Sequence, residues 1–219
     1  PGGHLRIVAS ARSSLRLVEG VVENRLIGEE ALARTEEALR DFRAIALGAG
    51  AREMRVYATA AVREAGDGAR FAGRLKRVAG SSVTILDGAA EARYGFEGAL
   101  RGLDADAGVL FDLGGGSIQI TEFRGRSPRR SWSLPLGALR LSRRYLDHDP
   151  PTDRDLRALR RHIDGFLDEL PVKPLFKGAQ LVGTGGTVRN LAKIDRFRRR
   201  VAAPRLHGHE LLAEDIEAI

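Results

Sequence analysis

A glycine-rich turn between two apolar runs restricts the fold of this chain more than any other feature. Residues 109–121 read Val-Leu-Phe-Asp-Leu-Gly-Gly-Gly-Ser-Ile-Gln-Ile-Thr. Two extended runs around a short turn predict a β-hairpin. Because Gly114, Gly115 and Gly116 carry no side chains, the backbone N–H groups of the turn are accessible to an anion. Asp112, just before the turn, is a candidate ligand for a metal ion or a water molecule.

The hairpin therefore predicts phosphate chemistry at its turn. The hydroxyl of Ser117 adds a donor to the glycine amides, and Asp112 would place Mg²⁺ or an attacking water. The alternative is an ordinary glycine-rich turn, although a two-residue hairpin turn does not need three glycines and a serine.

A second glycine loop strengthens the prediction. Gly185, Gly186 and Thr187 follow an apolar strand and begin a helix, whose N-terminal amides can bind an anion. By itself this loop is explained equally well as a structural strand-to-helix turn. Two such loops in one chain favour a nucleotide or phosphate-chain site.

Composition sets the broad class. The chain has 219 residues, of which 43% are hydrophobic, enough to bury the core of one large or two small domains. No apolar run approaches the roughly 20 residues of a membrane span, so no membrane association is expected. Cysteine is absent, which excludes disulfides and thiolate metal sites and favours a cytoplasmic location.

The charge balance favours a polyanionic partner. The net charge is +7 and the isoelectric point is about 10.4, and arginine suits phosphate oxygens. Codon bias toward arginine and alanine in a GC-rich genome explains the excess equally well. The arginine run at residues 196–200 is expected to be a solvated helix end, and a nucleic-acid partner is not expected.

Hydrophobic periodicity predicts alternating strands and helices. Extended segments are expected at residues 5–18, 54–58, 83–86, 109–113, 131–134 and 179–182, and helices at 29–47, 69–78, 89–100, 136–145, 188–194 and after the N-cap Thr152. This order predicts an α/β fold. The polar break at residues 102–107 is the best linker, which predicts one α/β domain at 1–104 and a second at 105–219.

Six motifs in chain order resemble the exopolyphosphatase and guanosine pentaphosphate phosphohydrolase (Ppx/GppA) family. They lie at residues 58–65, 91–93, 111–117, 136–141, 183–187 and 207–209. The resemblance implies the actin–hexokinase–Hsp70 architecture, in which two ribonuclease-H-like α/β domains face each other across a cleft. It also leads us to expect segments missing after Val18 and after Ile219. A homodimer is plausible for the family.

The resemblance also implies roles for particular residues. Glu91 matches the general base for the attacking water, and Asp112 matches the aspartate that holds the metal and that water. Residues 114–117 match a phosphate loop, and Arg63 matches an arginine that faces the bound phosphate. Taken alone, Glu91 and Arg63 would be read as solvated surface residues. Mg²⁺ is the implied cofactor.

Two departures from the family pattern remove carboxylates. Ala9 stands where the first phosphate loop has an aspartate, and Gln119 stands where a glutamate is expected near the metal. Glu122 is a poor substitute because three residues along a strand place it on the opposite face. The pair His207 and His209 is expected in a loop turn, since no third metal ligand lies nearby in the sequence.

The sequence thus predicts a Mg²⁺-dependent phosphohydrolase that releases terminal phosphate from inorganic polyphosphate or guanosine pentaphosphate. Ala9 and Gln119 keep open a second hypothesis, a polyphosphate- or nucleotide-binding regulator with impaired catalysis. A sugar or acetate kinase of the same superfamily is a third hypothesis, against which Arg63 and Glu91 argue in their specific contexts.

Overall fold

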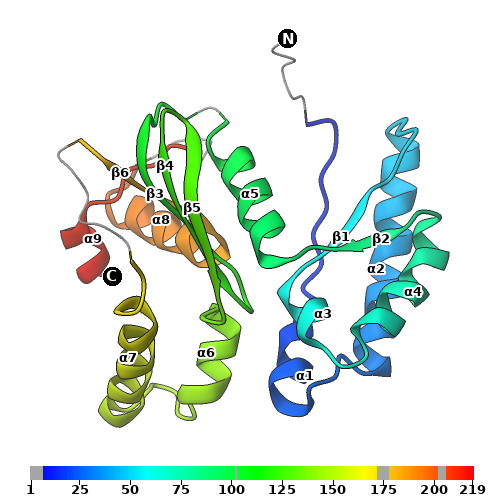
Figure 1. The fold of residues 1–219 in the computed structure, drawn as a ribbon, viewed down its shortest axis with the longest axis horizontal. Coiled ribbons are helices and arrows are strands. Elements are labelled where there is room, and N and C mark those ends of the chain that lie inside the picture. The colour runs from blue at the N-terminus through cyan, green and yellow to red at the C-terminus, as the bar shows by residue number, and fades with distance from the viewer. Residues whose placement is uncertain (1–6, 102, 172–177, 202–205) are drawn as a thin grey trace. The chain divides into compact units, whose positions relative to one another are not determined.

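The chain forms a mixed α/β structure of two compact units, Pro1–Asp87 and Gly88–Ile219 (Figure 1). The structure, a computed structural model, describes residues 7–101, 103–171, 178–201 and 206–219. Each unit contains its own sheet and its own cluster of buried apolar side chains. The domain boundary expected after residue 104 stays a prediction.

The first unit is built from helices around a short parallel sheet. Strands β1 (Val56–Ala58) and β2 (Val83–Ile85) pair in parallel. Its helices are α1 (Leu17–Asn24), α2 (Glu29–Gly48), α3 (Ala60–Glu64) and α4 (Gly68–Ala79). The helices expected at 29–47 and 69–78 and the strands expected at 54–58 and 83–86 are thereby confirmed, apart from shifts at their ends.

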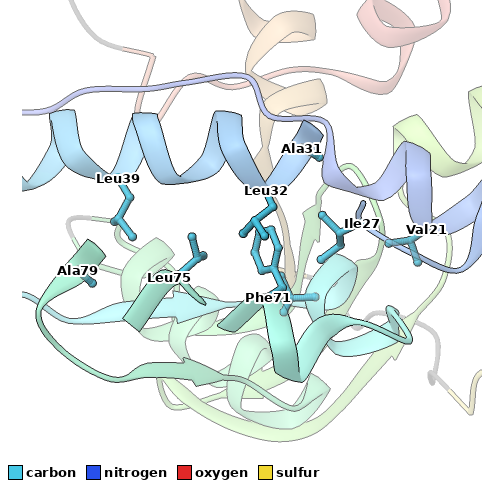
Figure 2. Packing of buried hydrophobic residues seen from close by; sticks show 9 residues of the cluster. Val21, Ile27, Ala31, Leu32, Leu39, Phe71, Leu75 and Ala79 are labelled. Carbon is cyan, nitrogen blue, oxygen red and sulfur yellow. The ribbon is translucent and has the colours of Figure 1, made fainter. Parts of the chain in front are cut away.

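The core of this unit lies between α2 and α4. Figure 2 shows Leu32 and Leu39 of α2 on the side that faces Phe71 and Leu75 of α4. These positions recur at helical spacing on each helix, so that each buries one apolar stripe. The carboxylate of Asp67 joins the two helices, because it accepts the amide protons of residues 27 and 28 at 2.9 and 3.1 Å.

The extended segment expected at residues 5–18 is not a strand in the described part. Residues 7–16 have no regular secondary structure, and Leu17 and Val18 begin helix α1. Val18 and Val21 lie one helical turn apart and are both buried, so they form the apolar side of an amphipathic helix. A strand needs a pairing partner, and the described sheet of this unit contains β1 and β2 alone.

The second unit is organised around a four-stranded sheet in the order β5-β4-β3-β6. Strands β3 (Ala107–Leu113), β4 (Ile118–Arg124) and β5 (Ser127–Leu134) form an antiparallel meander, whereas β6 (Gln180–Gly185) runs parallel to β3. The predicted hairpin is confirmed as β3 and β4. The strands expected at 131–134 and 179–182 are confirmed as parts of β5 and β6.

Helices α5 (Gly88–Ala99) and α8 (Gly186–Arg198) cover opposite faces of this sheet (Figure 1). Gly95 of α5 lies against the side chain of Asp112, while Val188 of α8 lies near Phe111 at Gly183. Because neighbouring residues of a strand point to opposite faces, these contacts place the two helices on the two sides. Phe96 of α5 packs on Phe123, with ring centroids 5.5 Å apart.

The described part of this unit also contains α6 (Ala138–Tyr145), α7 (Asp153–Leu167) and α9 (Ala213–Glu217). The predicted start of α7 is confirmed, because the hydroxyl of Thr152 accepts the amide proton of Asp155 and the Asp155 carboxylate accepts that of Thr152. Among the described residues, no helix is long and apolar enough to cross a membrane.

Candidate functional site

The two glycine loops of the sequence lie at one edge of the second unit's sheet. Strands β3 and β6 are parallel, so their carboxyl ends meet at the same edge. The pairing places Asp112 beside Thr184 and Leu113 beside Gly185. The turn after β3 and the N-terminus of α8 are therefore neighbours in space, although roughly 70 residues separate them in the sequence.

The carboxylate of Asp112 lies between two glycines. A Cβ atom added to Gly95 of α5 would lie 3.4 Å from one carboxylate oxygen, and one added to Gly185 would lie 3.0 Å from the other. Gly185 has a φ of +99° and approaches the Leu113 carbonyl so closely that a Cβ would lie 2.2 Å from its oxygen. Glycine is thus required at 185 for both reasons.

Within the described residues, Asp112 makes no hydrogen bond and no ion pair. The side chain is only partly exposed. A carboxylate that loses part of its hydration without gaining a partner is electrostatically unfavourable. A bound cation would relieve that cost, so the environment of Asp112 fits a metal ligand.

The carbonyl groups of the glycine turn are all engaged by α6. Gly114 O accepts the Ala138 amide proton at 2.9 Å, and Gly115 O accepts that of Arg140 at 3.0 Å. Gly116 O accepts a proton from Arg140 Nε at 2.7 Å. The amides of Gly115 and Gly116, by contrast, donate to no group in the described part of the chain. Two such donors in a side-chain-free turn are what an anion site requires.

A buried polar row runs from the turn across the sheet. Gln119 pairs directly with Asp112 on one side and with Ser133 on the other. Its amide nitrogen donates to the hydroxyl oxygens of Ser117 at 2.8 Å and Ser133 at 3.2 Å. Gln119 is 3% exposed and Ser117 is 5% exposed. Since α5 covers this face of the sheet, the row lies beneath that helix.

Glu122 does not replace the missing carboxylate. It lies on the other face of β4 from Gln119, as the strand period predicts. There it forms an ion pair with Arg130 of β5 at 2.8 Å, across the pair of strands.

Glu91 lies in the first turn of α5, in the same unit as Asp112. Gly88, Glu91 and Gly95 recur at spacings of three and four and so share one stripe of the helix. Gly88 lies against Ser133, because an added Cβ would be 2.7 Å from the serine Cβ, and Gly95 lies against Asp112. The stripe that carries Glu91 therefore follows the polar row.

Arg63 belongs to the first unit. Its guanidinium donates to the carbonyl oxygen of Leu86 at 2.6 Å, just after strand β2. This bond ties α3 to the end of the sheet. The predicted contact between Arg63 and a bound phosphate stays a prediction.

The sequence missed a charged cluster on α8. Asp195 is 3% exposed, and its carboxylate contacts His209 Nε2 at 2.8 Å and Arg199 Nε at 2.8 Å. Arg199 also pairs with Asp215, so it is not simply part of a solvated run. Burial raises the pKa of Asp195, but the hydrogen bonds from His209 and Arg199 outweigh it and lower that pKa below its usual value. The spacing of four between Asp195 and Arg199 was the one available signal.

The predicted turn at His207 is confirmed. No group of three His, Cys, Asp or Glu side chains in the described ranges is arranged to hold a metal ion. Mg²⁺ does not require such a group, because it commonly uses one or two carboxylates together with waters and substrate phosphates.

Comparisons with known proteins cover both units. A model of the Ppx/GppA phosphatase family matches residues 1–218. Exopolyphosphatase 1 of Mycobacterium leprae is 33% identical over 208 residues, which are 93% of this chain and 61% of that protein. Exopolyphosphatase 2 of Mycobacterium tuberculosis is 30% identical over 222 residues, 98% of this chain and 69% of that protein.

Solved structures agree with the sequence comparisons. An exopolyphosphatase from Cytophaga hutchinsonii has a TM-score of 0.76 at 26% identity, covering 87% of this chain and 62% of its own. The Ppx/GppA family member from Aquifex aeolicus has a TM-score of 0.73 at 25% identity, covering 92% and 65%. The chain thus spans about three fifths of the length of the first of these relatives, 61%.

Proposed function

The chain belongs to the Ppx/GppA phosphatase family, and on that premise we propose that it is a Mg²⁺-dependent phosphohydrolase. Its proposed substrates are inorganic polyphosphate and guanosine pentaphosphate, from which it would release terminal phosphate. The similarity to exopolyphosphatases over 93% of the chain supports this class of substrate.

One observation supports the proposal above the others. The carboxylate of Asp112 and the amides of Gly115 and Gly116 lie at the same sheet edge, and none of them has a hydrogen-bond partner among the described residues. A cation ligand beside anion-binding donors suits a phosphate group that carries Mg²⁺. The N-terminus of α8, with Gly185, Gly186 and Thr187, adds helix amides at that edge.

The proposed reaction is hydrolysis of the terminal phosphoanhydride. Glu91 accepts a proton from a water molecule, whose oxygen forms a bond to the terminal phosphorus. The bridging P–O bond breaks, and the shortened chain leaves with its electron pair. The amides of Gly115 and Gly116 and the hydroxyl of Ser117 hold the oxygens of the transferred group.

Asp112 would hold Mg²⁺, which supplies positive charge to the phosphate oxygens when bound. Arg63 as a further phosphate ligand rests on the family resemblance alone. A homodimer and a cytoplasmic location likewise remain proposals from that resemblance and from composition.

The test is phosphate release by the full-length protein and its Glu91→Gln variant. The variant is expected to lose at least about a hundredfold in turnover, because its amide cannot accept the proton. Glu97→Gln is the matched control, an exposed glutamate on the same helix. It should retain normal turnover and the same melting temperature. Normal turnover by Glu91→Gln would contradict the proposed base.

Parallel assays on polyphosphate and guanosine pentaphosphate, each with and without Mg²⁺, identify the substrate. Gln119, a neutral residue in the polar row, favours a second candidate function, a binding regulator. Tight polyphosphate binding without phosphate release would support the regulator. Phosphoryl transfer from ATP to a sugar or acetate would instead indicate a kinase.

A further inference from the structure

Gln119 donates two hydrogen bonds within the polar row, one of them to the last residue of the glycine turn. Its amide nitrogen donates both to Ser117 Oγ and to Ser133 Oγ. Each serine hydroxyl is the acceptor in its bond, so each keeps its own O–H proton for another acceptor. Ser117 is the last residue of the turn and follows Gly116 directly. The hydroxyl of Ser117 can therefore act as a donor together with the glycine amides.

A glutamate at position 119 would reverse this arrangement. A carboxylate only accepts hydrogen bonds, so the hydroxyl groups of both serines would donate their hydrogen bonds to it. Ser117 would then offer a ligand lone pairs instead of a proton. The same change would also place a second carboxylate directly opposite Asp112 in the antiparallel pair, at a cross-strand Cβ distance of about 5 Å.

Two carboxylates so close together repel each other and any phosphate, unless a cation lies between them. With Gln119, the polar row contributes one carboxylate, Asp112, and otherwise neutral groups. Burial beneath α5 makes this difference large, since charge interactions are less screened there than at the surface.

We propose that Gln119 is a positioning residue that directs the Ser117 hydroxyl proton to a phosphate group, so that this site binds a polyphosphate chain without Mg²⁺. The inference rests on the proposed function for the location of the substrate. In it, Mg²⁺ is required for hydrolysis and not for binding. Gln119 itself contacts neither the metal nor the reacting atoms.

The test is binding of tripolyphosphate to the full-length protein by calorimetry, in EDTA and in Mg²⁺. The parent protein is expected to bind with affinities that differ by less than about threefold between the two conditions. Gln119→Glu should bind about tenfold or more weakly in EDTA at about pH 8, where its carboxyl group is ionised. Mg²⁺ should restore most of that loss.

Acidification to about pH 5 should also restore part of the binding by Gln119→Glu, because burial and the neighbouring Asp112 carboxylate raise the pKa of the new carboxyl group, and its protonated form resembles the amide. Gln180→Glu is the matched control. It makes the same chemical change at an exposed position in the same sheet, at the opposite end of the strands. It corrects for the titration of tripolyphosphate and for the added charge, and it should follow the parent protein at both pH values.

Gln119→Met is a second variant of similar size that keeps position 119 neutral but removes both donated bonds. It should bind tripolyphosphate more weakly than the parent protein in EDTA and in Mg²⁺, with no added pH dependence. Circular dichroism establishes that each variant is folded, and the recovery by Gln119→Glu near pH 5 serves the same purpose. If Gln119→Glu does not fold, Gln119→Met decides, and parent-like affinity in that variant overturns the inference.

Three further results would overturn the inference. The parent protein could require Mg²⁺ to bind tripolyphosphate, or it could bind no tripolyphosphate at all. In the third result, Gln119→Glu binds tripolyphosphate in EDTA near pH 8 with the same affinity as the parent protein. The proposed function fails separately. Metal-independent binding that depends on Gln119, in a protein that releases no phosphate, would support the inference and reject the hydrolase.

Discussion

Asp112 is the residue on which the proposed chemistry depends most. Two glycines, Gly95 and Gly185, let the backbone of α5 and of the β6–α8 junction approach its carboxylate. Neither supplies a hydrogen bond to it. Among the described residues, Asp112 thus has space around its carboxylate and no hydrogen-bond or ion-pair partner, which is an environment that suits a cation ligand.

Replacing Asp112 by asparagine is expected to reduce turnover strongly and to leave the fold intact. Phosphate release in Mg²⁺ should fall on the order of a hundredfold, because the site loses the charge that holds the cation. The melting temperature should not decrease, since the described structure shows no partner that the substitution would remove. Asp104→Asn, at an exposed position before β3, is the control. More than half of normal activity in Asp112→Asn would contradict the assignment.

Asp195 carries a different prediction, one of pH-dependent stability. Burial raises the pKa of Asp195, but the hydrogen bonds from His209 and Arg199 outweigh burial and depress that pKa in the folded state. A group whose pKa is depressed by folding stabilises the fold at pH values above its unfolded-state pKa. This stabilisation disappears as the pH falls through the folded-state pKa. Asp195→Asn should therefore lower the free energy of unfolding at about pH 7, with a difference from the parent that shrinks at about pH 3.

Urea unfolding at several pH values measures this difference. Asp41→Asn, an exposed aspartate on α2, provides the comparison and should parallel the parent protein throughout. A constant difference between Asp195→Asn and the parent protein from neutral to acid pH would reject the electrostatic explanation.

At the level of single residues, a functional role could be predicted from the sequence only for residues that belong to a motif. The glycine turn pointed to Asp112 directly, whereas Glu91 required the family resemblance. Asp195 and His209 are 14 residues apart, and no periodic pattern relates a helix to the loop after it. Their contact depends on tertiary packing, which local sequence does not encode.

At the level of elements, helix α6 holds the glycine turn in place. Three carbonyls of the turn accept protons from α6, two from backbone amides and one from Arg140 Nε. Gly137, the N-cap of α6, touches the turn backbone so closely that an added Cβ would lie 2.3 Å from Gly116 C and 2.4 Å from Gly115 O. The geometry of the turn therefore depends on a glycine that lies roughly 20 residues later in the sequence.

Gly137→Ala should shift the turn, because backbone atoms cannot move aside as a flexible side chain would. We expect a loss of about 1–3 kcal/mol in the free energy of unfolding and weaker tripolyphosphate binding. Gly165→Ala, in α7 with nothing within 4 Å of the added Cβ, should instead gain about 0.5–1 kcal/mol. Denaturant unfolding and calorimetry measure both effects. Unchanged binding by Gly137→Ala would mean that α6 does not position the turn.

Elements with strong periodicity were predictable, and those that depend on partners were not. The hairpin, the capped start of α7 and the amphipathic α2 and α4 all follow from local patterns. Residues 7–16 have a strand-like composition but no strand in the structure. Pairing is a property of two segments, so an apolar segment alone does not determine it.

At the level of the whole molecule, all proposed site residues except Arg63 belong to the second unit. Glu91, Asp112, the glycine turn and the start of α8 all lie in Gly88–Ile219. The first unit has an independent apolar core between α2 and α4. The family match extends over both units. The family and the mixed α/β class could therefore be predicted from the motifs, unlike the contact of Asp195 with His209.

The charge of the whole chain predicts which substrate binds more tightly. The net charge of the chain is +7. A long polyanion can contact more of the positively charged protein surface than a compact nucleotide can. Long-chain polyphosphate should therefore bind more tightly than guanosine pentaphosphate at low ionic strength. Raising the salt from about 0.05 to about 0.5 M should weaken polyphosphate binding on the order of tenfold and guanosine pentaphosphate binding less, because salt screens exposed charges. Equal salt dependence for the two would show that only the local site, and not the overall charge, distinguishes them.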